Sequence, residues 1–315
     1  MVDWTRSSVS TSVTVLDQLD LAPPAPQERQ AFRTQPQPRT RCELEHVRVE
    51  GKRALQAADV DARVMEAQQI HPAIYTVRIP ADSTPSGLVA LTFDVFGTVV
   101  DWRGTIIREG SALDQTLDWP TLADAWRGLY QPTLERVTSG ELAWAPFDRL
   151  QRLMLDQVLD QFGVTSLSEA DRVSLGDVWR RMDAWPDAIS GLKRLKERFI
   201  IAALSNGSVR QLVGIAKHAG VPWDLILSVE LLHTYKPDPR VYRGAVELLQ
   251  AQPHELMMVA AHVYDLQAAK AQGLRTAFVA RPLEWGPHAS AEQAPAGEFD
   301  ILASDFDDLA SQLGC

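Results

Sequence analysis

The sequence predicts an α/β fold in which a parallel sheet is flanked by helices and interrupted by a helical subdomain. Short apolar runs alternate with amphipathic stretches from Gly87 onward. Such runs, bounded by polar turns and separated by helical patterns, are typical of buried parallel strands joined by crossover helices. The first two runs are about a hundred residues apart, far more than one crossover helix needs. We therefore expect an insertion between them.

The strands and helices of the sheet domain follow from these runs in order. Apolar runs predict strands over residues 88–93, 199–204, 225–229, 256–261 and 276–280. Amphipathic stretches predict helices over 186–198, 239–250 and 265–273. The last segment, 299–313, reads as one more strand and helix. Together these elements assign residues 86–105 and 185–315 to an α/β core domain.

The long interval carries helical patterns of its own, over residues 122–137, 145–163 and 168–182. We interpret residues 106–184 as a helical cap subdomain. Ligands of open parallel sheets bind outside the carboxyl ends of the strands. A cap inserted after the first strand would close a pocket there.

Residues 1–85 differ in composition from the rest. The stretch 22–41 is rich in Pro, Gln and Arg, which predicts disorder. A short helix is expected over residues 53–70. No chemically suggestive motif occurs in this extension, which we interpret as a disordered tail.

The composition excludes several classes of partner. The chain of 315 residues has a formal net charge of −10, which argues against binding to nucleic acid or to an anionic membrane. Its two cysteines form no disulfide or zinc pattern and suit a reducing cytosol. No apolar run approaches the roughly 18 residues that cross a bilayer, and the N-terminus lacks the apolar core of a secretory signal. We expect a cytoplasmic location.

Polar side chains follow four of the predicted strands. Because parallel strands end at the same edge of the sheet, we expect these groups to converge in space. Any one of them alone is better explained as a helix cap or turn residue, but that explanation weakens when four strand ends all supply such groups. The groups are Asp94 and Thr98, Ser205 and Asn206, Lys236 and Tyr242, and His262 and Asp265.

The order Asp-x-x-x-Thr, Ser-Asn, Lys-Pro and a final acidic loop resembles the haloacid dehalogenase (HAD) superfamily across residues 87–315. The resemblance implies a HAD-like Rossmannoid sheet. Most members of that superfamily are phosphatases that hold Mg²⁺ with further carboxylates. This chain has Phe96 where they carry a second Asp, and Ala260 and Ala261 where they carry a Gly-Asp pair. Magnesium needs hard oxygen ligands, so we expect neither a metal nor another cofactor.

Two further stretches, FDVFGTVVDWR at 93–103 and WRGLYQP at 126–132, are similar to the L-2-haloacid dehalogenase branch. That resemblance implies a hydrolase that converts short (S)-2-haloacids or haloacetates to 2-hydroxy acids and halide. It implies an ester intermediate on Asp94 and no metal requirement. A homodimer is common in the resembled branch.

The resemblance also implies roles for the residues of the core. Asp94 would be the nucleophile, and Thr98 would orient it through a hydrogen bond. Lys236 would balance the charges of Asp94 and Asp265. Tyr242 would stabilise that network, and Asp265 would help to position the hydrolytic water.

A second group of residues would bind the substrate and the halide. Arg127 would receive the departing halide, because its fixed positive charge stabilises an anion, and Asn206 would lie nearby. Ser205 and backbone N–H groups would hold the substrate carboxylate. Phe96 would make the pocket apolar.

His262 is a departure from the resembled branch, where many members have Ser-x-Asn in the fourth loop. Here the loop reads Ala260-Ala261-His262. A neutral imidazole three residues before Asp265 could accept a proton from the water that attacks the ester. The alternative is a histidine that only makes hydrogen bonds within its loop.

Other interpretations remain open from the residues alone. Arg127 could be a solvated helix charge, Lys236 a surface turn residue, and Tyr242 and Phe96 ordinary packing residues. The main alternative function is a HAD-type phosphatase or phosphonatase-like hydrolase. A non-catalytic binding protein that keeps the fold is a third possibility.

Overall fold

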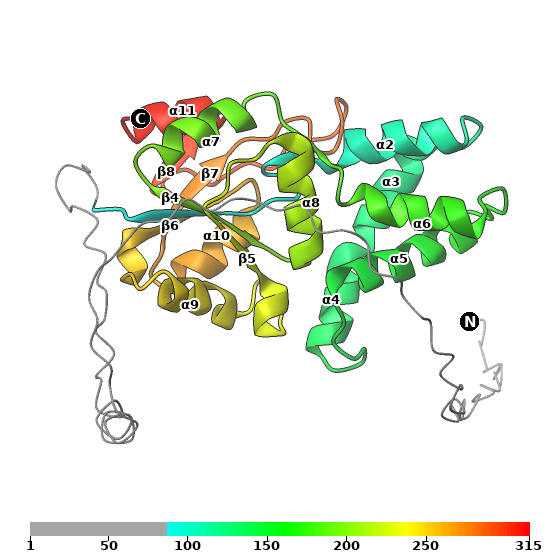
Figure 1. The fold of residues 1–315 in the computed structure, drawn as a ribbon, viewed down its shortest axis with the longest axis horizontal. Coiled ribbons are helices and arrows are strands. Elements are labelled where there is room, and N and C mark those ends of the chain that lie inside the picture. The colour runs from blue at the N-terminus through cyan, green and yellow to red at the C-terminus, as the bar shows by residue number, and fades with distance from the viewer. Residues whose placement is uncertain (1–86) are drawn as a thin grey trace, which may run out of the picture. The chain divides into compact units, whose positions relative to one another are not determined.

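A computed structural model describes residues 87–315 of the chain, so the predictions for residues 1–85 lie outside the described residues. Within the described part, six strands form one sheet in the order β5-β4-β1-β6-β7-β8. Every neighbouring pair in this sheet is parallel (Figure 1). The predicted α/β fold, with a parallel sheet and a helical insertion, is therefore confirmed.

The strands lie where the apolar runs predict them. The central strand β1 pairs with β4 on one side and β6 on the other, so that Ala90 lies opposite both Ile200 and Leu256. Every residue of β1 is buried, as expected for a strand covered on both faces. The six strands are β1 (Ala90–Phe93), β4 (Ile200–Ser205), β5 (Leu225–Ser228), β6 (Leu256–Ala260), β7 (Arg275–Val279) and β8 (Ile301–Ala303).

Helices cover both faces of the sheet. Figure 1 shows α7 and α11 on one side and α9 and α10 on the other. The helices of this domain are α7 (Ala188–Lys196), α8 (Val209–Ala219), α9 (Pro239–Leu248), α10 (Val263–Lys270) and α11 (Phe306–Gln312), with short 3₁₀ helices η2 (Val229–Leu232) and η3 (Pro253–Glu255). The Phe93 and Phe306 rings meet with centroids 5.7 Å apart, which ties the sheet to α11.

Five helices form the subdomain inserted between β1 and β4. They are α2 (Trp102–Leu113), α3 (Trp119–Gly128), α4 (Tyr130–Thr138), α5 (Phe147–Gln161) and α6 (Glu169–Val178). A short antiparallel pair, β2 (Val100–Asp101) and β3 (Asp183–Ala184), brings the entry and exit of this subdomain together. The domain limits at 106–184, and at 86–105 with 185–315, stay predictions.

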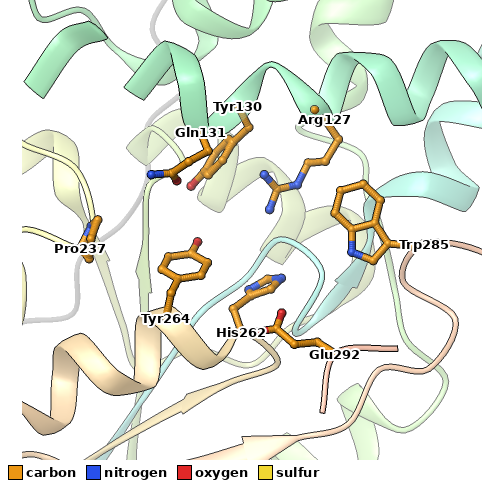
Figure 2. Close-up of a pocket in the computed structure, with 9 residues that line it drawn as sticks. Arg127, Tyr130, Gln131, Pro237, His262, Tyr264, Trp285 and Glu292 are labelled. Carbon is orange, nitrogen blue, oxygen red and sulfur yellow. The ribbon is translucent and has the colours of Figure 1, made fainter. Parts of the chain in front are cut away.

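The helical stretch predicted over 122–137 is two helices, broken at Leu129. The break follows from Pro132 in the first turn of α4, because proline has no amide proton to donate back to the Gly128 carbonyl. The break leaves Arg127 near the end of α3 and Tyr130 at the start of α4. Both side chains point toward the ends of the core strands (Figure 2).

No helix within residues 87–315 has the length and apolarity needed to cross a membrane. The cytoplasmic location stays a prediction.

Candidate active site

Asp94 directly follows the central strand, and its amide continues the sheet by donating to the Val259 carbonyl at 3.0 Å. The chain then turns tightly through Gly97, which has a φ of 86°, a conformation that favours glycine. This turn brings Thr98 back to the carboxylate, and its Oγ1 donates to Asp94 Oδ2 at 2.9 Å. The same Oγ1 accepts from the Ala261 amide at 3.0 Å. Thr98 thus connects the end of β1 to the end of β6.

Lys236 lies between two buried carboxylates. Its Nζ donates to Asp94 Oδ1 at 2.9 Å and to Asp265 Oδ2 at 2.5 Å. The Tyr242 hydroxyl donates to the other oxygen of Asp265 at 2.6 Å. The side chains of Lys236 and Asp265 are only 2% and 0% exposed, so this ion network is shielded from bulk water.

The charges of this network set the ionisation of Asp94. Burial raises the pKa of Asp94, but Lys236 and His262 outweigh burial and hold the pKa well below its usual range. For Asp265, burial and the nearby Asp94 charge raise the pKa despite Lys236. Burial lowers the pKa of the Lys236 ammonium group, but the carboxylates of Asp265 and Asp94 outweigh burial and raise it. Asp94 is therefore an ionised carboxylate across the physiological pH range.

His262 lies between Asp94 and a residue that the sequence did not indicate, Glu284. Its Nδ1 is 3.2 Å from Asp94 Oδ2, and its Nε2 is 3.1 Å from Glu284 Oε1. Burial alone would lower the pKa of His262, but Glu284 and Asp94 together raise it to about 10. His262 is thus an imidazolium at neutral pH in the free protein, in contrast to the neutral imidazole expected from the sequence.

Glu284 belongs to the irregular segment between β7 and β8. It is 3% exposed, and its Oε1 also accepts from Trp102 Nε1 at 3.1 Å. The positive charge of His262 outweighs burial and lowers the pKa of Glu284. The only sequence signal for this residue is an acidic side chain between two large apolar ones, Leu283 and Trp285, in a segment without helical or strand periodicity.

A cavity of about 510 Å³ lies beside this network. Figure 2 shows Arg127, Tyr130 and Gln131 extending from the helical subdomain on one side, with His262, Tyr264 and Trp285 on the other. The predicted convergence therefore includes residues of the helical subdomain, because the cavity is lined both by that subdomain and by the loop that follows β6.

Arg127 lies on the cavity wall without an ion pair in the described part of the chain, and its buried Nε has no hydrogen-bond partner there. Its guanidinium carbon is instead 4.0 Å from the centre of the Tyr130 ring. A cation that is held by an aromatic face keeps its N–H donors available for an anion.

The remaining predicted residues lie around these groups. Asn206 donates from Nδ2 to the Tyr130 hydroxyl at 2.6 Å and accepts from the Lys236 amide at 2.8 Å. Ser205 is fully buried at the end of β4, where its Oγ accepts from the Gly207 amide at 3.2 Å. The Phe96 ring packs edge-on against Trp179 of the subdomain, with centroids 5.3 Å apart. The structure thus brings eight of the ten predicted residues into one site, with Ser205 and Phe96 beside them in the chain, while the roles of all ten stay predictions.

The described residues contain no group of three or more His, Cys, Asp and Glu side chains arranged to hold a metal ion. The cationic groups that face Asp94 in this arrangement are Lys236 and His262.

Comparisons with known proteins agree with this architecture. The family model of haloacid dehalogenase-like hydrolases matches residues 88–273. An (S)-2-haloacid dehalogenase of a Pseudomonas species (strain CBS-3) is 30% identical over 197 residues, which cover 61% of this chain and 84% of that protein. One solved L-2-haloacid dehalogenase is 44% identical with a TM-score of 0.69, covering 72% of this chain and 99% of its own. A solved defluorinating L-2-haloacid dehalogenase is 40% identical with a TM-score of 0.70. The match covers 75% of this chain and 98% of that protein.

Proposed function

Since the chain belongs to the haloacid dehalogenase-like hydrolases, in the branch of the L-2-haloacid dehalogenases, we propose that it hydrolyses short (S)-2-haloacids or haloacetates to 2-hydroxy acids and halide. The observation that carries the proposal is the Asp94 carboxylate, held ionised by Lys236 beside a cavity that Arg127 lines. The reaction proceeds in two steps, alkylation of Asp94 and hydrolysis of the resulting ester.

In the first step, a carboxylate oxygen of Asp94 attacks the α-carbon of the haloacid, and the carbon–halogen bond breaks. The halide leaves with the bonding electron pair toward Arg127, whose guanidinium has no ion pair within residues 87–315 and stabilises the developing charge. Thr98 and Lys236 hold the carboxylate in one orientation, which lowers the entropic part of the barrier. Ser205 and neighbouring backbone amides bind the substrate carboxylate.

The second step depends on a change in the charge of His262. Esterification removes the negative charge of Asp94, and with it one of the two carboxylates that raise the pKa of His262. The imidazolium then releases its proton to solvent through the cavity. Neutral His262, still oriented by Glu284 at Nε2, accepts a proton from the water that attacks the ester carbonyl carbon. Collapse of the tetrahedral adduct releases the 2-hydroxy acid and restores the Asp94 carboxylate.

The test is halide release from chloroacetate and from L-2-chloropropionate in the presence of EDTA. We expect the wild type to release halide and Asp94→Asn to release none. In a single turnover in H₂¹⁸O with excess enzyme, the label should enter Asp94, because the product oxygen comes from the Asp94 carboxylate. A requirement for magnesium, phosphate release from phosphate esters, or full activity of Asp94→Asn would refute the proposal and favour a phosphatase or phosphonatase-like hydrolase.

A matched control for the loss of a carboxylate is Asp238→Asn. Asp238 is the N-cap of α9, two residues after Lys236, and asparagine caps a helix about as well as aspartate. This variant should keep wild-type activity. A homodimer, as is common in the resembled branch, stays a prediction that sedimentation of the purified chain would test.

A further inference from the structure

Tyr130 contacts Arg127 of the helical subdomain and Asn206 of the core, and the reaction proposed above assigns it no role. It opens α4 directly after the break at Leu129, so its side chain enters the cavity from the helical subdomain (Figure 2). Its ring also meets Phe147 edge-on, with centroids 5.4 Å apart. The ring is therefore fixed by packing as well as by its contacts in the site.

The face of the Tyr130 ring holds Arg127. The guanidinium carbon lies 4.0 Å from the ring centroid, while the Trp102 ring is 5.9 Å away. A carboxylate partner would neutralise Arg127 and compete with a bound anion. An aromatic face orients the guanidinium while leaving its charge and N–H donors available.

The hydroxyl of Tyr130 reaches the core. It accepts from Asn206 Nδ2 at 2.6 Å, and Asn206 Oδ1 accepts from the backbone amide of Lys236 at 2.8 Å. The Lys236 side chain then contacts Asp94. A continuous series of hydrogen bonds therefore runs from the helical subdomain to the segment that carries the lysine. Both polar ends of Asn206 are used in this series, so Asn206 acts here as a link.

We propose that Tyr130 is a positioning residue that couples the anion-binding arginine of the helical subdomain to the lysine of the core. The inference rests on the proposed function and deepens it. The ring sets the orientation of Arg127 toward the departing halide. The hydroxyl, through Asn206, sets the Lys236 segment and with it the orientation of the Asp94 carboxylate.

Two substitutions separate these contributions. Tyr130→Phe keeps the ring and removes the hydroxyl, so the rate of Asp94 alkylation by chloroacetate should fall about tenfold, the value of one hydrogen bond. The concentration of sodium bromide that inhibits the Tyr130→Phe variant should stay within about twofold of the wild-type value, because the ring that holds Arg127 remains. Tyr130→Leu loses both contacts, so bromide inhibition should also weaken by about tenfold or more. A purely structural role would move both quantities together in both variants.

Tyr235→Phe is the matched control. The Tyr235 hydroxyl also joins core to subdomain, by donating to the Ala145 carbonyl, but it contacts no side chain of the site. We expect this variant to lose stability with little change in alkylation rate or bromide inhibition. If it slows alkylation as much as Tyr130→Phe does, the coupling through Asn206 is refuted.

Bromide binding can be followed without turnover, by the tryptophan fluorescence of the intact protein, since Trp102 lies near Arg127. This measurement separates the two proposals. A wild type that releases no halide refutes the proposed function, while unchanged bromide affinity in Tyr130→Leu refutes the role of the ring. An unchanged alkylation rate in Tyr130→Phe refutes the role of the hydroxyl. If Tyr130→Leu does not fold, Tyr130→Met replaces it.

Discussion

Gly97 leaves open the space that the Glu284 carboxylate fills. A Cβ added at Gly97 would lie 2.2 Å from Glu284 Oε1, and the φ of Gly97 is +86°. The turn that returns Thr98 to Asp94 and the acid that holds His262 therefore depend on the same missing side chain. The segments around Gly97 and Glu284, far apart in the sequence, therefore pack closely at this point.

We expect Gly97→Ala to lower both stability and turnover. The alanine would be strained at a positive φ, at a cost of about 1 kcal/mol or more, and would displace Glu284 from His262. Urea unfolding and chloroacetate turnover would measure the two effects. Gly176→Ala is the control, because Gly176 lies within α6 with open space around its Cα, and alanine there should be stabilising by about 0.5–1 kcal/mol. Wild-type turnover in Gly97→Ala would contradict the prediction.

His262→Ala should leave alkylation of Asp94 largely intact and slow ester hydrolysis by about 100-fold or more, the usual contribution of a general base. Glu284→Gln should slow the same step less, because the histidine remains but loses its orienting carboxylate. Rapid quenching and mass spectrometry of the peptide that contains Asp94 would detect the trapped ester. Glu298→Gln, on the same segment but bonded to Gln267, is the control and should not accumulate it. Absence of an adduct together with unimpaired turnover in His262→Ala would refute the role of His262.

Lys236→Met should abolish activity and lower the free energy of unfolding by about 3–5 kcal/mol, because it leaves the buried Asp265 without a cation and Asp94 with His262 alone. Adding Asp265→Asn to Lys236→Met should restore part of that stability but no activity. Arg240→Met is the control, since Arg240 is exposed and solvent screens its pair with Asp238, so this variant should unfold much like the wild type. Denaturation in urea at neutral pH measures all three variants. Equal losses in Lys236→Met and Arg240→Met would contradict the buried network.

The stability of the protein should depend on pH through His262. Its pKa rises from 6.5 to about 10 on folding, so the folded state binds this proton more tightly than the unfolded chain. The resulting stabilisation is fully present below pH 6.5 and is lost as the pH rises through about 10. Urea unfolding between pH 6 and 10 should therefore show a steeper loss of unfolding free energy in the wild type than in His262→Gln. Parallel profiles would show that His262 is not held between two charges.

The sequence alone predicts much of the sheet and the core of the site, because these depend on local patterns. Buried parallel strands need continuous apolar runs, and the ends of such strands meet at one edge. The sequence alone therefore predicts that Asp94, Lys236 and Asp265 lie close together. The absence of a second acid at Phe96 disfavoured magnesium-dependent phosphoryl transfer but left a phosphatase as the alternative function.

The charge of His262, the partner Glu284 and the contacts of Tyr130 were decided only by the tertiary structure. Glu284 comes from an irregular segment that has no periodic signal, and its effect on the pKa of His262 requires two atoms to lie 3.1 Å apart. Tyr130 reaches both Arg127 and Asn206 only because the helix breaks at Leu129. Local sequence patterns report which residues are buried and where strands end. The pKa shifts and hydrogen bonds between segments far apart in the sequence change steeply over distances of a few ångströms. They are therefore fixed only when the chain is packed.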